Sequence, residues 1–271
     1  MKRLIIIAAI IAFLNLTGCT TSPTGRSQFM LVSPEQAISA SKEAYVKTIQ
    51  PLDDKGKIDS DPLVTNRVKI ITGRIISQAI KQYPHTRNWE WSVKVIDDPK
   101  TVNAWCMAGG KMAIYTGLLN KVEPTDDELA QVMGHEISHA LANHTAEKMS
   151  VQLATQIGLV AVAVAVHDNK YSGAALTGTA LAATMAIQLP NSRTAETEAD
   201  RMGIELAARA GYNPNAAATL WQKMGKVGGS TPPEFMSTHP APGNRQKTLK
   251  ALAPKMMPLY RQKIARPVYP L

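Results

Sequence analysis

Two histidines and a glutamate near the middle of the chain stand at a spacing that suits metal chemistry. His135, Glu136 and His139 belong to the segment His-Glu-Ile-Ser-His. On a helix, residues four apart lie on one face, so both imidazoles can reach the same ion, and zinc fits this spacing. Glu136 is rotated by about 100° from His135, which directs it away from the metal and toward a water that the metal activates. The segment therefore predicts a hydrolytic zinc site in which Glu136 is the general base.

A third zinc ligand must come from further along the chain, because a catalytic zinc ion usually keeps three protein ligands and one open position. His144 follows His135 by nine residues, which does not match the spacing of metzincins. Glu196 is the better candidate, because on a helix it shares a face with Asp200 while Glu198 points away. Asp200 can then accept the outer N–H of a ligand histidine and fix its tautomer.

Apolar residues at helical spacing predict the elements that precede this site. Two helices are expected over residues 34–49 and 63–83, separated by an acidic, turn-rich loop over 51–62. The zinc histidines fall within a third helix, whose start is marked by Thr125-Asp126-Asp127-Glu128. This run matches a capping box, and its acidic residues suit the positive end of the helix dipole.

Shorter segments predict a small sheet. Strands are expected over residues 91–95, 103–108 and 111–116, and Gly109-Gly110 joins the last two as a hairpin. The fold class that follows is α+β: a mostly helical domain with a small β-sheet packed on the zinc-binding helix.

The second half of the chain is predicted to be helical. A helix from about 192 to 210 carries Glu196 and ends at Gly211. Gly203 on its metal-facing side would let it approach the zinc helix closely. Residues 151–189 are rich in Ala, Val and Thr around a polar interruption. Each apolar half is too short to span a bilayer, so we expect a buried helical hairpin, with a hairpin that dips into a membrane as the alternative.

The first residues have the pattern of a bacterial lipoprotein signal. Lys2 and Arg3 precede an apolar run over residues 4–14, which is too short for a spanning helix. The following Leu16-Thr17-Gly18-Cys19 resembles a lipobox, in which the cysteine is acylated and becomes the first mature residue. We therefore expect Cys19 to be lipidated.

Three parts of the chain follow from this pattern, and its composition limits what they bind. We predict a signal peptide over residues 1–18, a lipidated N-terminus and tether over 19–33 that includes the polar stretch 20–27, and one catalytic domain over 34–271. Apolar residues make up 45% of the chain, which indicates an ordered domain. The net charge is +9, but no run of Lys and Arg alternates with aromatic residues, so nucleic acid is not a predicted partner.

Taken together, these residues resemble a known family of zinc peptidases. The segment from His135 to His139, with Glu196-Thr197-Glu198-Ala199-Asp200, is similar to the HtpX/Oma-type and CAAX-prenyl-protease-like gluzincins, metallopeptidase family 48. Further segments look like the bacterial lipoprotein members of that family and extend the resemblance over nearly the whole mature chain. They are Thr24 to Gln28, Asn103 to Trp105, Tyr115 to Leu119, and Thr238-His239-Pro240 with Arg245.

The resemblance implies a role for each matching residue. It assigns the binding of one zinc ion per chain to His135, His139 and Glu196, and it makes Glu136 the base. Asp200 is expected to support a ligand histidine.

The same resemblance places His239 on a loop close to the active site. There it either occupies the open position of the metal in a latent state or stabilises the oxyanion that forms on the substrate. Arg245 is expected to hold this loop. Trp105 and the following Cys106-Met107 depart from the residues that are common in the family.

The predicted partner is a protein or peptide in extended form. We expect Asn103, Ala104 and Trp105 to form an exposed sheet edge that faces the zinc and binds substrate through main-chain hydrogen bonds. The resemblance implies misfolded or unassembled cell-envelope proteins as substrates. The predicted function is therefore a zinc metalloendopeptidase for protein quality control. The alternative is a periplasmic chaperone or assembly factor with a latent zinc site.

The expected location is the periplasmic side of the cell envelope. Thr20, and not an aspartate, follows the cysteine of the lipobox, which is compatible with passage to the outer membrane of a Gram-negative bacterium. The lipid at Cys19 would hold the protein to the membrane, and envelope assembly machinery is a further expected partner.

Overall fold

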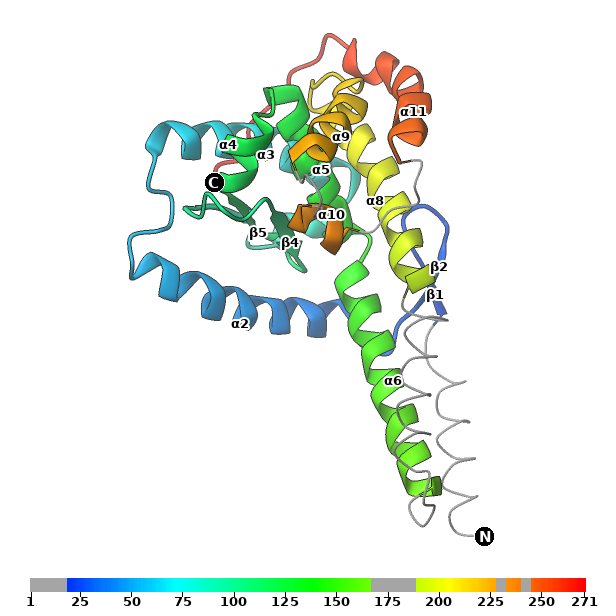
Figure 1. Cartoon of the computed structure of the whole chain (residues 1–271). Helices are drawn as coiled ribbons and strands as arrows, with labels where there is room; N and C mark the ends of the chain where they lie inside the picture. Colours follow the sequence, from blue (N-terminus) through cyan, green and yellow to red (C-terminus); the bar gives the residue numbers. More distant parts are fainter. Residues whose placement is uncertain (1–18, 167–188, 228–232, 240–244) are drawn as a thin grey trace.

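The computed structural model describes residues 19–166, 189–227, 233–239 and 245–271 (Figure 1). The expected signal peptide and part of the expected helical hairpin, residues 167–188, lie outside the described residues. Within the described part, helices dominate and two small sheets are present. This confirms the predicted mostly helical α+β class.

Helices make up most of the described chain. They are α2 (Pro34–Asp53), α3 (Pro62–Gln82), the 3-10 helix η1 (Pro84–Asn88), α4 (Thr116–Val122), α5 (Asp126–Leu141), α6 (His144–Val166), α8 (Leu189–Arg209), α9 (Ala216–Val227), α10 (Glu234–Thr238) and α11 (Arg245–Tyr260). The strands are short. They are β1 (Cys19–Thr21), β2 (Ser27–Phe29), β3 (Ser92–Ile96), β4 (Ala104–Met107) and β5 (Lys111–Tyr115). The predicted helices and strands agree with these elements to within a few residues at each end, which is the usual uncertainty of element boundaries.

α5 is the element around which the others pack. Its start is set by a capping box, in which Thr125 Oγ1 accepts the backbone N–H of Glu128 at 3.3 Å and the Glu128 carboxylate accepts the N–H of Thr125 at 2.9 Å. This confirms the predicted start of the zinc helix. Nearly every side chain from Glu128 to Leu141 is buried, because α3, α8, α9 and β4 all pack on α5 (Figure 1).

α5 and α8 approach closely where two glycines meet. A Cβ atom on Gly203 would lie 2.7 Å from the backbone nitrogen of His135, and one on Gly134 would lie 2.8 Å from the carbonyl oxygen of Gly203. Real Cβ atoms essentially never lie this close to backbone atoms, so only glycine fits at both positions. As predicted for Gly203, the crossing brings α8 next to the zinc histidines.

The larger sheet has the strand order β3-β5-β4. β4 and β5 form the predicted antiparallel hairpin through Gly109 and Gly110, whose φ angles of +80° and +81° are ones that other residues rarely adopt. β3 pairs in parallel with the other side of β5. Among the described strands, β4 therefore has one unpaired edge, and it packs against α5.

The prediction of a polar tether after the expected lipidation site is wrong. β1 and β2 pair as an antiparallel hairpin, and two of its polar side chains are buried. Ser22 and Gln28 are buried, and Arg26 forms ion pairs with Glu147 of α6 and Glu198 of α8. Ser22, Thr24 and Arg26 thus satisfy the buried charge of Glu198, while Thr20, Thr21 and Ser27 are exposed.

α6 extends away from the body of the domain (Figure 1). It is the described half of the expected hairpin, but its side chains Leu153, Val160 and Val164 are exposed, Val160 to 64%. The prediction of a buried segment is therefore wrong for the part within α6. The helix extends beyond α2, α5 and β2, which pack on it. Among the helices that the structure describes, none combines the length and the apolar character needed to cross a bilayer.

The close helix crossing yields a prediction about stability. Gly203→Ala should destabilise the protein by about 1–3 kcal/mol, because the added methyl group meets backbone that can yield only if α5 and α8 move apart. It should also weaken zinc binding, since the donors lie on both helices. Denaturant unfolding and zinc titration of the purified protein measure the two effects.

Gly225→Ala is the matched control for this variant. Gly225 lies in α9, and a Cβ atom there would meet nothing within 4 Å. This substitution should leave stability unchanged or raise it by about 0.4–1 kcal/mol. Equal effects of the two substitutions would show that the crossing is not tight.

Candidate metal centre and active site

α5 and α8 bring metal-binding side chains into one buried group. His135 and His139 project from successive turns of α5, and Glu196 faces them from α8. The Nε2 atoms of the two histidines are 3.0 Å apart, and they lie 3.1 and 3.3 Å from the carboxylate oxygens of Glu196. His239 adds a fourth donor, and the four ligand atoms all lie within 4.8 Å of one another.

The spacing of these donors fits zinc. Around a tetrahedral zinc ion with bonds of about 2.0–2.1 Å, neighbouring ligand atoms are about 3.3–3.4 Å apart. The close pairs in this group are separated by 3.0 Å to 3.4 Å. Imidazole nitrogen and carboxylate oxygen are also the donors that hydrolytic zinc sites use. The residues present therefore suit a zinc ion.

The ionisable side chains of the metal-binding group shift one another's pKa values. Burial raises the pKa of Glu196, but hydrogen bonds from the surrounding histidines outweigh it and hold this pKa well below the ordinary value. Burial and the charge of Arg245 lower the pKa of His135, but hydrogen bonds to Asp200 and Glu196 raise it to about 9. Burial lowers the pKa of His139. An ionised carboxylate thus faces a protonated imidazole, and a divalent cation would replace that proton.

Glu136 lies beside the donors and lines a cleft of about 410 Å³. Its Oε1 atom is buried and accepts no hydrogen bond from the described residues, and the nearest ionisable nitrogen, Nε2 of His239, is 3.5 Å away. Burial raises the pKa of this carboxyl group. A free lone pair and a raised pKa suit a general base that takes a proton from water.

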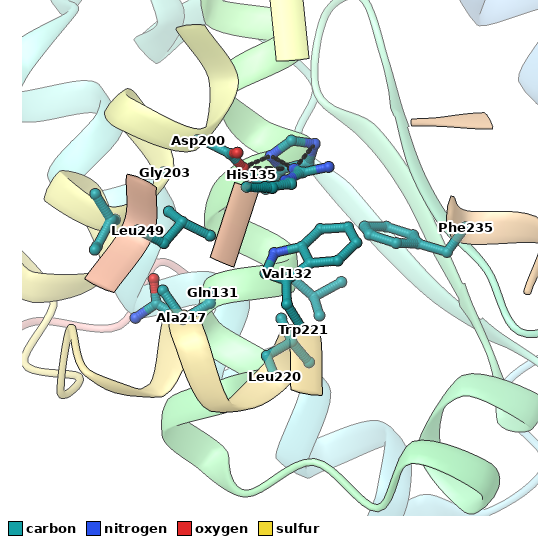
Figure 2. Close-up of a pocket in the computed structure, with 12 residues that line it drawn as sticks. Gln131, Val132, His135, Asp200, Gly203, Ala217, Leu220, Trp221, Phe235 and Leu249 are labelled. Carbon is teal, nitrogen blue, oxygen red and sulfur yellow. Dashed lines mark hydrogen bonds and ion pairs between the residues drawn. The ribbon is translucent and has the colours of Figure 1, made fainter. Parts of the chain in front are cut away.

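Asp200 lies on the outer side of the His135 ring (Figure 2). Arg245 Nη2 contacts the same ring, at 2.9 Å from Nδ1 and 3.2 Å from Nε2. Asp200 Oδ1 lies 3.0 Å from His135 Nδ1 and accepts a hydrogen bond from Arg245 Nη2 at 2.5 Å. The guanidinium stacks on Trp221 at 3.9 Å from the ring centroid. A cavity of about 20 Å³ remains on this side, which is room for about one water. Arg245 Nη1 also lies 3.4 Å from the backbone oxygen of His239, so it contacts the loop that it was expected to hold.

His239 lies at the end of α10, next to the zinc donors. Its Nδ1 atom is 3.2 Å from Glu196 Oε1 and 3.4 Å from His135 Nε2. Phe235 stacks on its ring, with the centroids 4.6 Å apart. This places the imidazole where a fourth ligand would bind. Its role as a latent ligand or as a catalytic helper stays a prediction.

Comparison with known proteins agrees with this geometry. Residues 62–253 match the family model of peptidase family M48, and this range contains all four donors. The chain belongs to peptidase family M48. It carries the metal site of an M48 zinc metalloendopeptidase at His135, His139 and Glu196.

Individual M48 relatives come from mitochondria and bacteria. The chain is 32% identical to the mitochondrial metalloendopeptidase OMA1 of Bos taurus over 251 residues, which cover 89% of this chain and 47% of that protein. It is 39% identical to the mitochondrial metalloendopeptidase OMA1 of Arabidopsis thaliana over 174 residues, 64% of this chain and 34% of that protein. It is 30% identical to the beta-barrel assembly-enhancing protease of Escherichia coli strain K12 over 218 residues, 78% of this chain and 43% of that protein. The chain thus spans about half or less of the length of these relatives.

Two residues of the M48 site were not assigned from the sequence. His144 is absent from the metal-binding group, but its Nδ1 lies 2.8 Å from His139 Nδ1 and its Nε2 lies 3.2 Å from Glu198 Oε2. Glu198 points away from the metal, as predicted, yet it is buried and contacts the β1–β2 hairpin. No local pattern could reveal this pair, because its members are 54 positions apart.

The expected substrate strand is only in part as predicted. β4 is an edge strand among the described strands, and Trp105 lines the M48 cleft. Asn103 and Ala104 are buried, so the predicted exposure is wrong for these two. Asn103 is covered by α10, since its Nδ2 donates to Glu234 Oε1 at 3.0 Å and the Phe235 N–H donates to Val102 O at 2.9 Å, whereas Ala104 belongs to the hydrophobic core. The use of this edge by substrate stays a prediction.

Removal of the α8 ligand should abolish tight zinc binding. Glu196→Ala takes away one of three protein ligands together with its negative charge, so weak residual binding is the most that should remain. Zinc content after purification and competition with a chelator measure this. Wild-type zinc affinity in the variant would show that Glu196 is not a ligand.

The matched control lies on the same helix. Glu205 forms a partly exposed ion pair with Arg209 at 2.8 Å, and Glu205→Ala should bind zinc like the wild type. Glu198 would be a poor control, because its carboxylate is buried and bonded to His144.

Proposed function

We propose that this chain is a zinc metalloendopeptidase that hydrolyses peptide bonds of misfolded or unassembled cell-envelope proteins. The observation that supports this most is the position of Glu136 beside the zinc donors, with a buried carboxylate oxygen that has no hydrogen-bond partner among the described residues. A purely structural zinc site has no need of such a base.

Residues of the chain are positioned for each step of peptide hydrolysis. A bound zinc ion would supply Lewis acidity that activates water and polarises the scissile carbonyl. Glu136 accepts the proton that the attacking water loses and passes it to the leaving amine. The raised pKa of Glu136, caused by burial, helps it to hold the proton between these two steps. Asp200 and Arg245 keep the His135 ring in the orientation that metal binding requires.

The cleft suits an extended polypeptide as substrate. It lies between β4 and α6, with Trp105 and Val151 among its apolar residues and Lys148 and Gln152 among its polar ones. β4 has an unpaired edge within the described part, so a substrate strand could form main-chain hydrogen bonds that do not depend on its sequence. This favours unfolded proteins over a single sequence motif.

A location in the cell envelope fits both the N-terminal sequence and the relatives. The bacterial relative is named a beta-barrel assembly-enhancing protease, and the lipobox-like segment that ends at Cys19 is typical of envelope lipoproteins. We propose that Cys19 carries a lipid that holds the enzyme on the periplasmic side of the outer membrane, close to the machinery that assembles envelope proteins.

The proposed activity is tested by Glu136→Gln in the full-length protein. The variant should keep its zinc, because Glu136 is not a ligand, and should cut an unfolded protein such as casein about 10²–10⁴ times more slowly. Removal of zinc from the wild type should abolish cleavage, and added zinc should restore it. Unchanged cleavage by the variant would contradict the proposal.

The same variant separates the enzyme from a chaperone. A chaperone with a latent zinc site would support envelope assembly in cells equally well when Glu136 is replaced by glutamine, whereas a protease would not. The position of His239 as a fourth donor is the observation that favours a latent site. Proteolysis and envelope assembly should therefore be measured in the same Glu136→Gln strain.

The position of His239 beside the zinc donors leads to a prediction about its effect on the rate of cleavage. If its Nδ1 occupies the open position of the metal, His239→Ala should raise the rate of cleavage while zinc stays bound through three ligands. If His239 instead stabilises the oxyanion, the rate should fall by about 10²–10³. Initial rates on casein, measured at equal zinc occupancy, decide between the two.

Lipid attachment is tested by Cys19→Ser. The wild-type protein should sediment with membranes and have the mass of an acylated chain that begins at Cys19. The variant should lose the acyl mass and the membrane association. Equal membrane binding with the same processed mass would rule out a lipid at this residue.

A further inference from the structure

The two zinc histidines are supported on their outer sides in different ways. A metal-binding imidazole that coordinates through Nε2 is oriented by the hydrogen bond that its Nδ1–H donates. His135 has Asp200 at 3.0 Å for this purpose. His139 has His144, whose Nδ1 lies 2.8 Å from its own. A neutral imidazole is a weaker support than a carboxylate, unless it is itself held in place.

His144 is held by Glu198. Its Nε2 lies 3.2 Å from Glu198 Oε2. One set of tautomers satisfies the whole chain of contacts: His139 Nδ1–H donates to His144 Nδ1, and His144 Nε2–H donates to Glu198. A carboxylate thus acts on His139 through one intervening imidazole.

Glu198 is in turn fixed by the turn between β1 and β2. Its Oε1 accepts hydrogen bonds from Ser22 Oγ and, at 2.5 Å, from Thr24 Oγ1, and its Oε2 accepts one from Arg26 Nε at 2.8 Å. The Arg26 guanidinium also forms a bidentate pair with Glu147 of α6 at 2.7 and 2.6 Å. A buried carboxylate that holds four donors has a defined position.

We propose that the β1–β2 hairpin positions the zinc ligand His139 through Glu198 and His144. This inference rests on the proposed zinc site and extends it to residues 22–26, which contact no metal donor themselves. The hairpin begins at Cys19, so the segment next to the proposed lipid forms part of the support of the metal centre. Residues 22–26, Glu198 and His144 are then positioning residues.

Zinc affinity of the full-length protein, measured by chelator competition, tests the proposal in three variants. His144→Phe keeps an aromatic ring but removes both nitrogens, and it should weaken zinc binding about 10–100-fold. His144→Gln retains a donor and an acceptor and should restore part of this loss. Thr24→Val removes one hydroxyl from Glu198, is expected to fold, and should give a smaller loss in the same direction.

A second readout separates positioning from general destabilisation. Co²⁺ bound in place of zinc has a visible spectrum that reports ligand geometry, and this spectrum should change in His144→Phe and in Glu198→Gln. Glu128→Gln is the matched control: Glu128 is 3% exposed, Glu198 is 5% exposed, and Glu128 accepts bonds from Lys223 and Thr219 without contact to the donors. It should lose stability but keep the wild-type spectrum and zinc affinity.

The outcomes distinguish this inference from the proposed function. If the wild type binds no zinc, the proposed function fails. If the wild type binds zinc and the His144 and Thr24 variants match it in affinity and cobalt spectrum, only the positioning role is overturned. If Glu128→Gln weakens zinc as much as Glu198→Gln, the effect is one of stability, and the positioning role is again overturned.

Discussion

Backbone contact between α5 and α8 at Gly134 and Gly203 is the constraint on which the metal centre depends. Because no side chain separates the helices there, His135 lies directly beside the backbone of α8, and the short carboxylate of Asp200 reaches its ring. Glu196, about one turn earlier on α8, meets the two Nε2 atoms on the other side of that ring. Positioning to within about 1 Å decides whether such groups act together. The fold meets this demand with two rigid helices and no loop.

Three acidic residues of α8 point toward different parts of the structure. Glu196 and Asp200 are about 40° apart around the helix and both face α5, whereas Glu198 is about 200° from Glu196 and faces α6 and the β1–β2 hairpin. Buried carboxylates are costly unless they are paired and hydrogen-bonded. The compensating charges come from far along the chain, from Arg26 beside Glu198 and from Arg245 beside Asp200. Segments near the two ends of the chain are thus bound to one helix by the charges that the metal site requires.

Because the partners of these buried carboxylates lie far away along the chain, only some parts of the structure could be predicted from the sequence. The zinc histidines and the Thr125 capping box are readable because helical geometry fixes contacts between residues three and four apart. Arg26 and Glu198 are 172 positions apart, and no periodicity connects them. A polar, turn-rich segment has the same composition whether it is a solvated linker or the partner of buried carboxylates, so the sequence pattern favoured a tether where the structure has a hairpin. For the same reason the spacing of His144 disfavoured it as a ligand but could not show its contact with His139.

α10 contacts both the metal centre and the segment that leads into β4. α10 carries His239 to the zinc donors, and the same short helix is bound to the start of β4 by the hydrogen bonds from Phe235 N–H to Val102 O and from Asn103 to Glu234. If His239 is the latent ligand, its imidazole blocks water and the scissile carbonyl, while α10 covers the segment before β4 at Asn103. A displacement of α10 large enough to remove His239 from Glu196 would also break these two bonds to β4. In the proposed enzyme, such a displacement would expose the open position of the metal and this end of the sheet edge together, so that substrate entry and activation would share the same contacts.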